Sequence, residues 1–199
     1  EYDAFGVDLP SEHSDRYAMA QEWFDYVTRL WKEDHAFDWD GTFFRGKGVY
    51  GRPHPIQSRI PVINAAASEE GRAFAMRNAD FLFTPVFDFD QAKATVDEIS
   101  QKSASVGRDV NVLTFCTVVC RPTQQEAEDY LHWYANDNAD WDAVDNLMTL
   151  QGMHAQSFTK EALSMFRDRF AAGHGGFPLV GTPDHIADQL ERLSETGVA

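Results

Sequence analysis

The chain is poor in cysteine and in basic residues, and it has no long apolar run. Its 199 residues include two cysteines, and 17 Lys and Arg stand against 32 Asp and Glu, which gives a net charge of −15. Nucleic acids and anionic membrane surfaces bind clustered Lys and Arg, so both are disfavoured as partners. No apolar run approaches the roughly 20 residues of a membrane-spanning helix.

The two cysteines exclude a disulfide framework. Cys116 and Cys120 lie four apart in a strand-like run, where both side chains point to one face and cannot bridge to each other. A reducing, cytoplasmic location fits this usage best. No signal peptide is visible, and the chain begins at Glu1 rather than Met. We therefore expect both ends to be cuts through a longer protein.

Several catalytic motifs are also missing. The seven histidines form no His-x-x-x-His pair, so we expect no metal site. The acidic residues between 137 and 145 lack the glycine and the final Glu of a calcium loop, and we interpret them as a solvated helix face. No phosphate-binding Gly-x-x-x-x-Gly-Lys loop and no Gly-x-Ser-x-Gly elbow occur. The glycine-rich residues 173–176 permit close approach to a ligand but identify none.

What the chain does have is an alternation of apolar strand-like runs and helical periods. Buried strands are expected at 60–66 and 80–84, a further strand at 110–120, and helices at 68–78, 89–105 and after Thr123. This order is typical of an α/β fold with parallel strands and helical crossovers. We expect one domain over 1–199, with irregular or inserted segments at 34–59 and 137–178.

The remaining elements are expected at the two ends of the chain. A helix from 14 to about 31, capped by Ser14 or Asp15, buries a stripe that includes Trp23. A small hairpin is expected to pair 42–44 with 49–50. A last helix begins at Thr182-Pro183, and residues 197–199 begin a further strand.

Two groups of residues have the chemistry of a phosphate site. Ser68 lies between a strand and a helix, where backbone N–H groups suit a phosphate, although these residues by themselves favour a plain helix cap. His13, Arg16 and Tyr17 place hydrogen-bond donors, a cation and an aromatic ring at the start of the first helix. The alternative is that Tyr17 packs in the core and the other two lie at the surface.

At these residues the sequence resembles the bacterial luciferase-like flavin-dependent monooxygenases. The resemblance follows the chain in order over nearly its whole length, and it is strongest for the two-component enzymes that act on pyrimidines, dimethylsulfone, alkanesulfonates, long-chain alkanes and aminopolycarboxylates. It is carried by the stretches Glu1-Tyr2, His13-Ser14-Asp15-Arg16-Tyr17, Leu30-Trp31, Pro53-His54-Pro55, Asn64-Ala65-Ala66-Ala67-Ser68, Ala79-Asp80, Gly107-Arg108 and Pro178-Leu179-Val180-Gly181-Thr182-Pro183.

This resemblance implies a (β/α)8 TIM barrel, present here as a partial barrel, with FMN at the carboxyl ends of its strands. An NAD(P)H-dependent flavin reductase would supply reduced FMN, and O2 and a small organic molecule would be the substrates. A homo-oligomer, dimer or tetramer, is also implied. A deazaflavin-dependent oxidoreductase of the same fold, or a non-catalytic flavin-binding relative or inactive fragment, is the alternative.

The resemblance also assigns cofactor-binding residues, but no catalytic residue. Ser68 and the neighbouring amide of Glu69 would hold the FMN phosphate, His13, Arg16 and Tyr17 would contact its phosphate–ribityl end, and Glu1 would contact the flavin. The chain departs from the alkanesulfonate enzymes, which place Arg and His where Phe115 and Thr117 stand here. That departure disfavours a sulfonate substrate.

Overall fold

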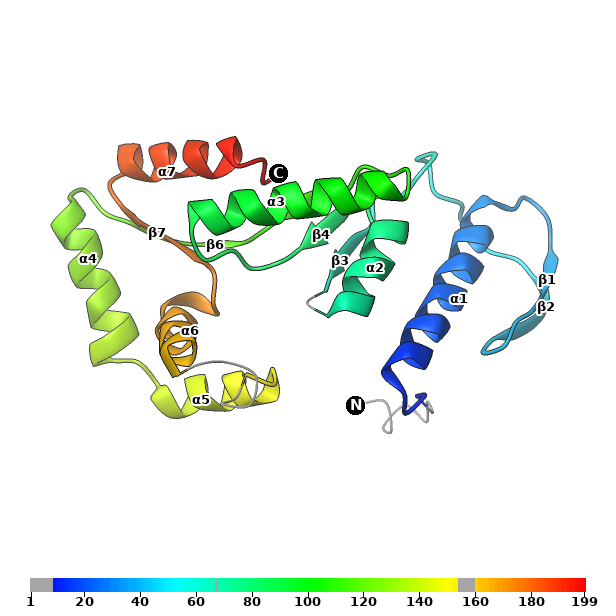
Figure 1. Cartoon of the computed structure of the whole chain (residues 1–199), viewed down its shortest axis with the longest axis horizontal. Helices are drawn as coiled ribbons and strands as arrows, with labels where there is room; N and C mark the ends of the chain where they lie inside the picture. Colours follow the sequence, from blue (N-terminus) through cyan, green and yellow to red (C-terminus); the bar gives the residue numbers. More distant parts are fainter. Residues whose placement is uncertain (1–8, 67, 154–159) are drawn as a thin grey trace.

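The computed structural model describes residues 9–66, 68–153 and 160–199. The described elements form an elongated arch, with α1 and the β1–β2 hairpin at one end and α4 at the other, and α7 returns the chain to the centre (Figure 1). In chain order they are α1 (His13–Lys32), β1 (Phe37–Asp40), β2 (Arg45–Val49), β3 (Ile63–Ala65), α2 (Glu69–Asn78), β4 (Phe81–Phe83), α3 (Phe89–Ser105), β5 (Asn111–Leu113), β6 (Cys116–Cys120), α4 (Gln124–His132), the π-helix η2 (Trp133–Asp137), α5 (Trp141–Leu150), α6 (Lys160–Gly173), β7 (Phe177–Gly181) and α7 (Pro183–Glu195).

The centre of the molecule is a parallel sheet of order β3-β4-β5. In its register Asn64 lies beside Leu82, and Leu82 beside Val112. Val198 adds a parallel bridge to Val112, so the chain ends in the start of a fourth strand, as expected. Helices α2 and α3 connect successive strands, which confirms the strand–helix alternation read from the sequence.

Helices seal one face of this sheet and leave the other face open. Leu82 and Val112 point to the sealed face and are essentially fully buried. They pack in one core cluster with side chains of α2, α3 and α7, among them Ala75, Ile99 and Leu193. On the open face Ile63 is 59% exposed. The expectation of a fully buried strand at 60–66 was therefore wrong, because the described residues cover β3 from one side.

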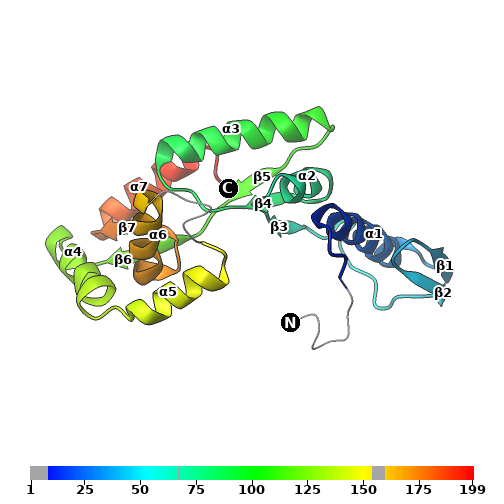
Figure 2. The ribbon, with the colours of Figure 1, turned by 60° about the horizontal axis from the view of Figure 1, so that its bottom comes forward.

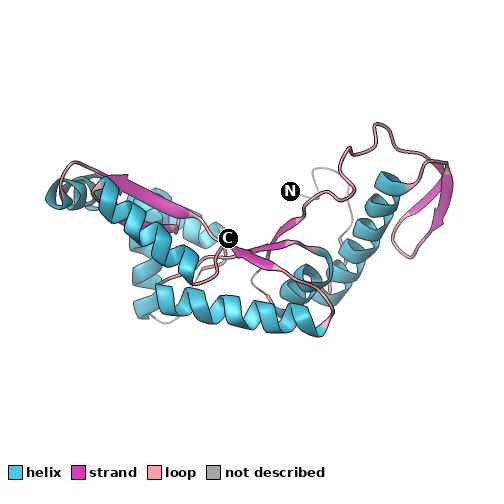
Figure 3. Cartoon of the chain, turned by 90° about the horizontal axis from the view of Figure 1, so that it is seen from above, coloured by secondary structure: helices cyan, strands magenta, loops and turns pink. Residues whose placement is uncertain are grey.

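The strand-like run at 110–120 is two strands rather than one. β5 pairs with β4, whereas β6 pairs in parallel with β7 in a separate two-stranded sheet. The run breaks at Thr114 and Phe115, where the chain leaves one partner and takes another. Figure 3 shows the strands of both sheets following one another along the molecule. β7 was not among the expected strands, and Pro178 lies within it.

The first helix and the hairpin differ from expectation in detail. α1 is capped at Glu12, without a side-chain hydrogen bond, rather than at Ser14 or Asp15. Trp23 is 51% exposed and does not belong to the buried stripe. The hairpin pairs β1 with β2, and residues 42–44 form its turn. The Glu22 carboxylate of α1 fixes that turn by accepting the backbone N–H groups of all three turn residues.

The segment 137–178 is largely helical. α5 and α6 share a small core of Val144, Met148 and Phe166. Its acidic residues have local structural roles, since Asp140 caps α5 and Asp145 binds Arg167. Figure 2 shows α5 and α6 together beside β6 and β7. Within the described residues no cluster could hold a metal ion, and no helix is long and apolar enough to cross a membrane.

Candidate phosphate-binding site

The candidate site lies where the parallel strands end. β3 ends at Ala65, and Ser68 then caps α2 by accepting the Gly71 N–H at 3.1 Å. The carboxyl ends of β4 and β5, at Phe83 and Leu113, lie at the same edge because the strands are parallel and in register. In open and closed α/β folds this edge is where ligands bind.

The structure brings Tyr17 to Ser68 across 51 residues of chain. The two hydroxyl oxygens lie 3.4 Å apart. Gly71 completes the group, because a Cβ at Gly71 would overlap the Tyr17 hydroxyl and lie 2.9 Å from the Ala66 Cβ. Two hydroxyls therefore meet at the first turn of α2 beside a residue that has no side chain. We refer to Tyr17, Ser68 and Gly71 as the hydroxyl cluster.

Contacts between α1 and α2 hold Tyr17 in this position. The Gln21 and Asn78 amides exchange two hydrogen bonds, at 3.1 and 2.6 Å, and Asn78 also donates to the Phe74 carbonyl oxygen. The Phe74 ring packs between Tyr17 and Phe24, with ring centroids 6.2 and 6.1 Å away. The hydroxyl cluster thus rests on a packed helix pair rather than on a loop.

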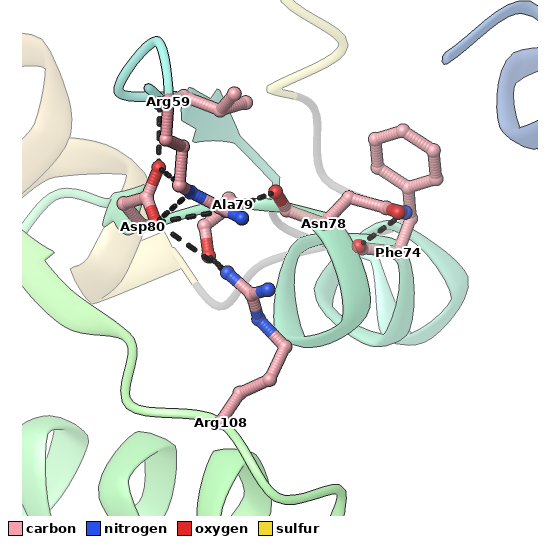
Figure 4. Close-up of polar contacts among 7 residues, drawn as sticks. Arg59, Phe74, Asn78, Ala79, Asp80 and Arg108 are labelled. Carbon is pink, nitrogen blue, oxygen red and sulfur yellow. Dashed lines mark hydrogen bonds and ion pairs between the residues drawn. The ribbon is translucent and has the colours of Figure 1, made fainter. Parts of the chain in front are cut away.

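Asp80 organises the opposite, amino end of the sheet (Figure 4). Its carboxylate binds Arg59 at 2.8 Å and Arg108 at 3.4 Å, and it accepts the Val62 N–H at 2.9 Å. Arg108 also donates to the Ala79 carbonyl oxygen. Burial raises the pKa of Asp80, but the Val62 N–H and the two guanidinium groups outweigh burial and hold the pKa below its ordinary value of 3.8.

The other predicted site residues are placed differently. Arg16 donates to the carbonyl oxygens of Pro10 and Ser11, on the segment before α1. His13 is the first residue of α1, but its side chain lies outside what the structure describes, and Glu1 lies outside the described residues altogether. Glu69 lines a hollow of about 500 Å³ between α2 and α3 with Arg72 and Lys102.

The hydroxyl cluster fits a phosphate by its chemistry. The first turn of a helix presents unpaired N–H groups and the positive end of the helix dipole. Gly71 is buried against the Tyr17 hydroxyl, which lies 3.4 Å from the Ser68 hydroxyl, so two hydroxyl groups meet at this turn. Glu69 and Glu70, in the same first turn, are the groups that would repel a phosphate. Glu69 lines a hollow with Arg72, Arg77 and Lys102.

Next to this edge lies an aromatic pair. Phe83, the last residue of β4, stacks on Phe115 with ring centroids 5.7 Å apart. Thr117 uses its hydroxyl to donate to the Gly173 carbonyl oxygen at 3.0 Å. Burial raises the pKa of the Cys116 thiol, which keeps it protonated at neutral pH. The side of the site that Phe115 and Thr117 occupy is therefore apolar and uncharged.

Comparison with known proteins identifies the family. The family model described as luciferase-like monooxygenase matches residues 1–199. The chain belongs to the luciferase-like monooxygenase family. This membership confirms the resemblance read from the sequence and the luciferase-like α/β fold.

Individual relatives agree with this family. An FMNH2-dependent dimethylsulfone monooxygenase of Pseudomonas putida is 29% identical over 199 residues, which cover 94% of this chain and 53% of the relative. The crystal structure of a long-chain alkane monooxygenase superposes with a TM-score of 0.81 at 21% identity, covering 99% of this chain and 53% of that one. An F420-dependent secondary alcohol dehydrogenase gives a TM-score of 0.63 at 15% identity, covering 100% of this chain and 58% of that one. The chain thus spans about half the length of the curated relatives it matches.

Sequence reasoning missed Gly71, Gln21 and Asn78 as parts of this site. Gly71 lies three residues after the expected cap, and a glycine inside a helix that otherwise has a good period marks a close approach. That signal was available. The Gln21–Asn78 pair left no local signal, because its two residues are 57 apart and each lies on a regular helix.

Proposed function

We propose that this chain is part of a two-component monooxygenase that uses reduced FMN and O2 to oxygenate a small organic molecule. The observation that carries the proposal is the hydroxyl cluster at the carboxyl edge of the sheet, in a chain that matches the luciferase-like monooxygenase family over its full length. A relative named as an FMNH2-dependent dimethylsulfone monooxygenase supports the choice of cofactor and reaction.

In this proposal Ser68, Tyr17 and the first-turn N–H groups of α2 hold the FMN phosphate. Reduced flavin supplies the chemistry with O2 when it is bound. The chain itself anchors the phosphate, orients the rest of the cofactor along the carboxyl edge and keeps one side of the site apolar with Phe83 and Phe115. Arg16 and His13, at the start of α1, are proposed to contact the phosphate–ribityl end of FMN.

The complete protein is proposed to form a (β/α)8 barrel, to which these residues contribute β3, β4, β5 and the strand that begins at Val198. The uncovered face of β3 supports this, because the inner face of a barrel strand packs against the other strands. We also propose that an NAD(P)H-dependent flavin reductase is the partner of this protein and that the protein forms a homo-oligomer. Both proposals follow from the two-component branch of the family.

The first test is a titration of the protein with FMN, oxidised and then reduced, followed by flavin fluorescence and calorimetry. We expect saturable binding, and Ser68→Ala should weaken it by about 1–3 kcal/mol, the usual effect of losing a hydrogen bond to a charged group. Absence of binding by the wild-type protein, in both redox states, would overturn the proposal.

Thr123→Ala is the matched control. Thr123 caps α4 just as Ser68 caps α2, within a capping box that includes Glu126, but it lies away from the hydroxyl cluster. Both variants should lose about 1 kcal/mol of unfolding free energy, since both lose an N-cap. Of the two variants, only Ser68→Ala should lose FMN affinity. An equal FMN affinity in the two variants would reduce Ser68 to a helix cap.

A deazaflavin coenzyme is the second candidate, because the fold is shared with an F420-dependent enzyme. An anaerobic titration with F420 in parallel with FMN separates the two, since each proposal requires tighter binding of its own coenzyme. A non-catalytic flavin-binding protein would bind FMN tightly yet consume no O2 above the free-flavin background. An oxygen-electrode measurement with reduced FMN distinguishes that case.

A further inference from the structure

Charge is distributed unevenly along the chain. Residues 41–59 include four of the 17 Lys and Arg but none of the 32 Asp and Glu, and we call them the basic segment. Residues 122–153 include seven Asp and Glu but no Lys or Arg, and we call them the acidic segment. A positive stretch of this kind is unexpected in a chain with a net charge of −15. Segregated charge creates surface potentials that steer oppositely charged partners together.

The two segments lie toward opposite ends of the molecule (Figure 1). The basic segment includes β2 of the hairpin, whereas the acidic segment includes α4, η2 and α5. Within the described residues no salt bridge joins the one segment to the other. One copy of the chain therefore leaves both charges unbalanced, and a second copy offers each segment its opposite.

The cations of the basic segment are available for a contact. Lys47 and Arg52 are exposed, and neither has a carboxylate partner in the part of the chain that the structure describes. Arg52 lies over the Tyr50 ring, 5.2 Å from its centroid, and donates to the Tyr50 hydroxyl at 2.6 Å. Arg45 pairs with Asp40 at 3.3 Å, but both side chains are so exposed that water screens the pair. The basic segment thus presents cations to solvent, one of them against a ring that is half exposed.

The hairpin that carries these cations has a fixed shape. The Glu22 carboxylate accepts the three backbone N–H groups of the turn at 42–44 and a hydrogen bond from the Trp39 indole. The Tyr26 ring packs on Phe37 and Trp39, with ring centroids 6.1 and 5.1 Å away. A surface that is already ordered loses little conformational entropy when a partner binds. The hairpin therefore presents its charges as a preformed surface.

The acidic segment offers the complementary surface. Arg167 pairs with Asp145, but in the described residues no Lys or Arg pairs with any of the other six carboxylates. The six are Glu126, Glu128, Asp129, Asp137, Asp140 and Asp142. Tyr130 and Trp133 stack in the same segment with ring centroids 5.7 Å apart, and both are exposed. Exposed aromatic rings of this kind are enriched on the surfaces where proteins meet.

We propose that the basic segment of one copy docks on the acidic segment of a second copy of this chain. In a two-fold dimer the contact occurs twice, because each copy supplies both segments. This inference rests on the homo-oligomer of the proposed function, and it requires neither FMN binding nor a particular reaction. The competing explanation is that copies associate through the uncovered face of the sheet, where Ile63 is exposed. Salt separates the two, since it screens contacts between exposed charges and leaves apolar contacts in place.

The first measurement is sedimentation equilibrium of the wild-type chain over a range of protein concentrations. It is made at about 0.1 M and about 1 M NaCl, between which the screening length falls from about 10 Å to about 3 Å. We expect a dimer whose dissociation constant rises at least about tenfold at the higher salt concentration. This comparison needs no substitution, so it tests the proposal even where a variant fails to fold.

Charge reversal locates the contact. The basic-segment variant carries Lys47→Glu and Arg52→Glu, and the acidic-segment variant carries Asp129→Lys and Asp142→Lys. In either variant like charges face each other in both contacts of the dimer. At the lower salt concentration, each variant should raise the dissociation constant of the dimer at least about tenfold.

The control variant carries Lys93→Glu and Lys102→Glu. Both lysines lie on α3, outside the two segments, and their reversal changes the net charge as much as the basic-segment variant does. The dissociation constant of its dimer should stay within about twofold of the wild-type value. Circular dichroism and thermal unfolding of every variant show whether folded chains are being compared.

An equimolar mixture of the basic-segment and acidic-segment variants tests whether the two segments meet each other. In a mixed two-fold dimer, one contact joins two reversed segments and the other joins two wild-type segments, so both contacts again join opposite charges. We expect the mixture to dimerise with about the wild-type affinity, although neither variant does so alone. The control variant mixed with the acidic-segment variant should not, because one of its contacts still joins like charges.

Each result supports or overturns the proposal. A wild-type chain that stays monomeric at both salt concentrations would overturn it. A dimer that resists both salt and charge reversal would place the contact on another face, such as the uncovered face of the sheet. A mixture that fails to associate would show that the two segments do not meet. FMN titration of the same samples keeps the two proposals apart, since a dimer that behaves as expected but binds no FMN contradicts the cofactor assignment alone.

Discussion

The two ends of the parallel sheet satisfy their polar groups in different ways. At the amino end, Asp80 gathers two guanidinium groups and a backbone N–H, so protein groups bind protein groups. At the carboxyl end, the hydroxyls of Tyr17 and Ser68 meet at the first turn of a helix, beside Gly71, which has no side chain to separate them. The first end holds strands together, and the second is where we propose that a ligand binds.

Residues that stabilise the fold and residues that are proposed to bind FMN therefore lie at opposite ends of one short helix. α2 connects the two ends, since Ser68 caps its start and Asn78, in its last turn, lies beside the Asp80 cluster. A substitution at the amino end should therefore lower stability and spare FMN affinity, whereas one at the carboxyl end should lower FMN affinity. The predictions below use that separation, from the largest expected effect to the smallest.

The largest effect is expected from Asp80→Ala. The variant leaves Arg108 partly buried without its carboxylate and removes the acceptor of the Val62 N–H, so unfolding free energy should fall by about 2–3 kcal/mol. Urea unfolding measures it, and FMN affinity should stay unchanged. Asp97→Ala is the control, because its exposed pair with Lys93 is expected to contribute less than about 0.5 kcal/mol. Equal losses in the two variants would contradict the role given to Asp80.

Gly71→Ala should act on binding. Its new Cβ would collide with the Tyr17 hydroxyl and crowd Ala66, so Tyr17 must move away from Ser68. FMN affinity should fall about tenfold, or about 1.4 kcal/mol. Unfolding free energy should change by less, because alanine is the better helix former and offsets part of the crowding. A variant with full FMN affinity would show that the contact between the two hydroxyls is not needed.

Tyr17→Phe should have a smaller effect on the same property. The ring and its packing on Phe74 are kept, and one hydroxyl is removed. We expect FMN affinity to fall by about 1 kcal/mol and thermal unfolding to stay the same. If unfolding changes and affinity does not, Tyr17 belongs to the packing of α1 on α2 rather than to the site.

The smallest effect is a dependence of stability on pH. The pKa of Asp80 is lowered in the folded protein, so its contribution to stability is complete above the ordinary value of 3.8 and is lost as the pH falls through the folded value. The stability difference between wild type and Asp80→Asn should therefore be constant from about pH 7 to about pH 5 and shrink below about pH 4. Unfolding curves across this range measure it. A difference that grows on acidification would contradict the assignment.

Local signals predicted most of the sheet and its crossovers. α3 matches the expected bounds because its helical period is strong and Gly107 follows it. Ser68 and Thr123 cap their helices as expected, since capping depends on the residue and its next three neighbours. Such features depend on a few neighbouring residues, so they can be predicted from the sequence.

The remaining features depend on partners that are far apart in the chain. The break in the run at 110–120 follows from a change of pairing partner, which β propensity does not record. The meeting of Tyr17 with Ser68 depends on how α1 docks on α2, through Gln21 and Asn78. The structure confirms Ser68 as a helix cap, and its role at a phosphate stays a prediction.

That break has a mechanical consequence. Thr114 and Phe115 are the whole connection between β5 and β6, and Phe115 is fixed by its stacking on Phe83 and by the hydrogen bond from Phe177. A linker this short and this firmly held has no slack. Helices α4, α5 and α6 are therefore tightly connected to the central sheet. A change in their orientation would first displace residues at the carboxyl edge, where the cofactor is proposed to bind.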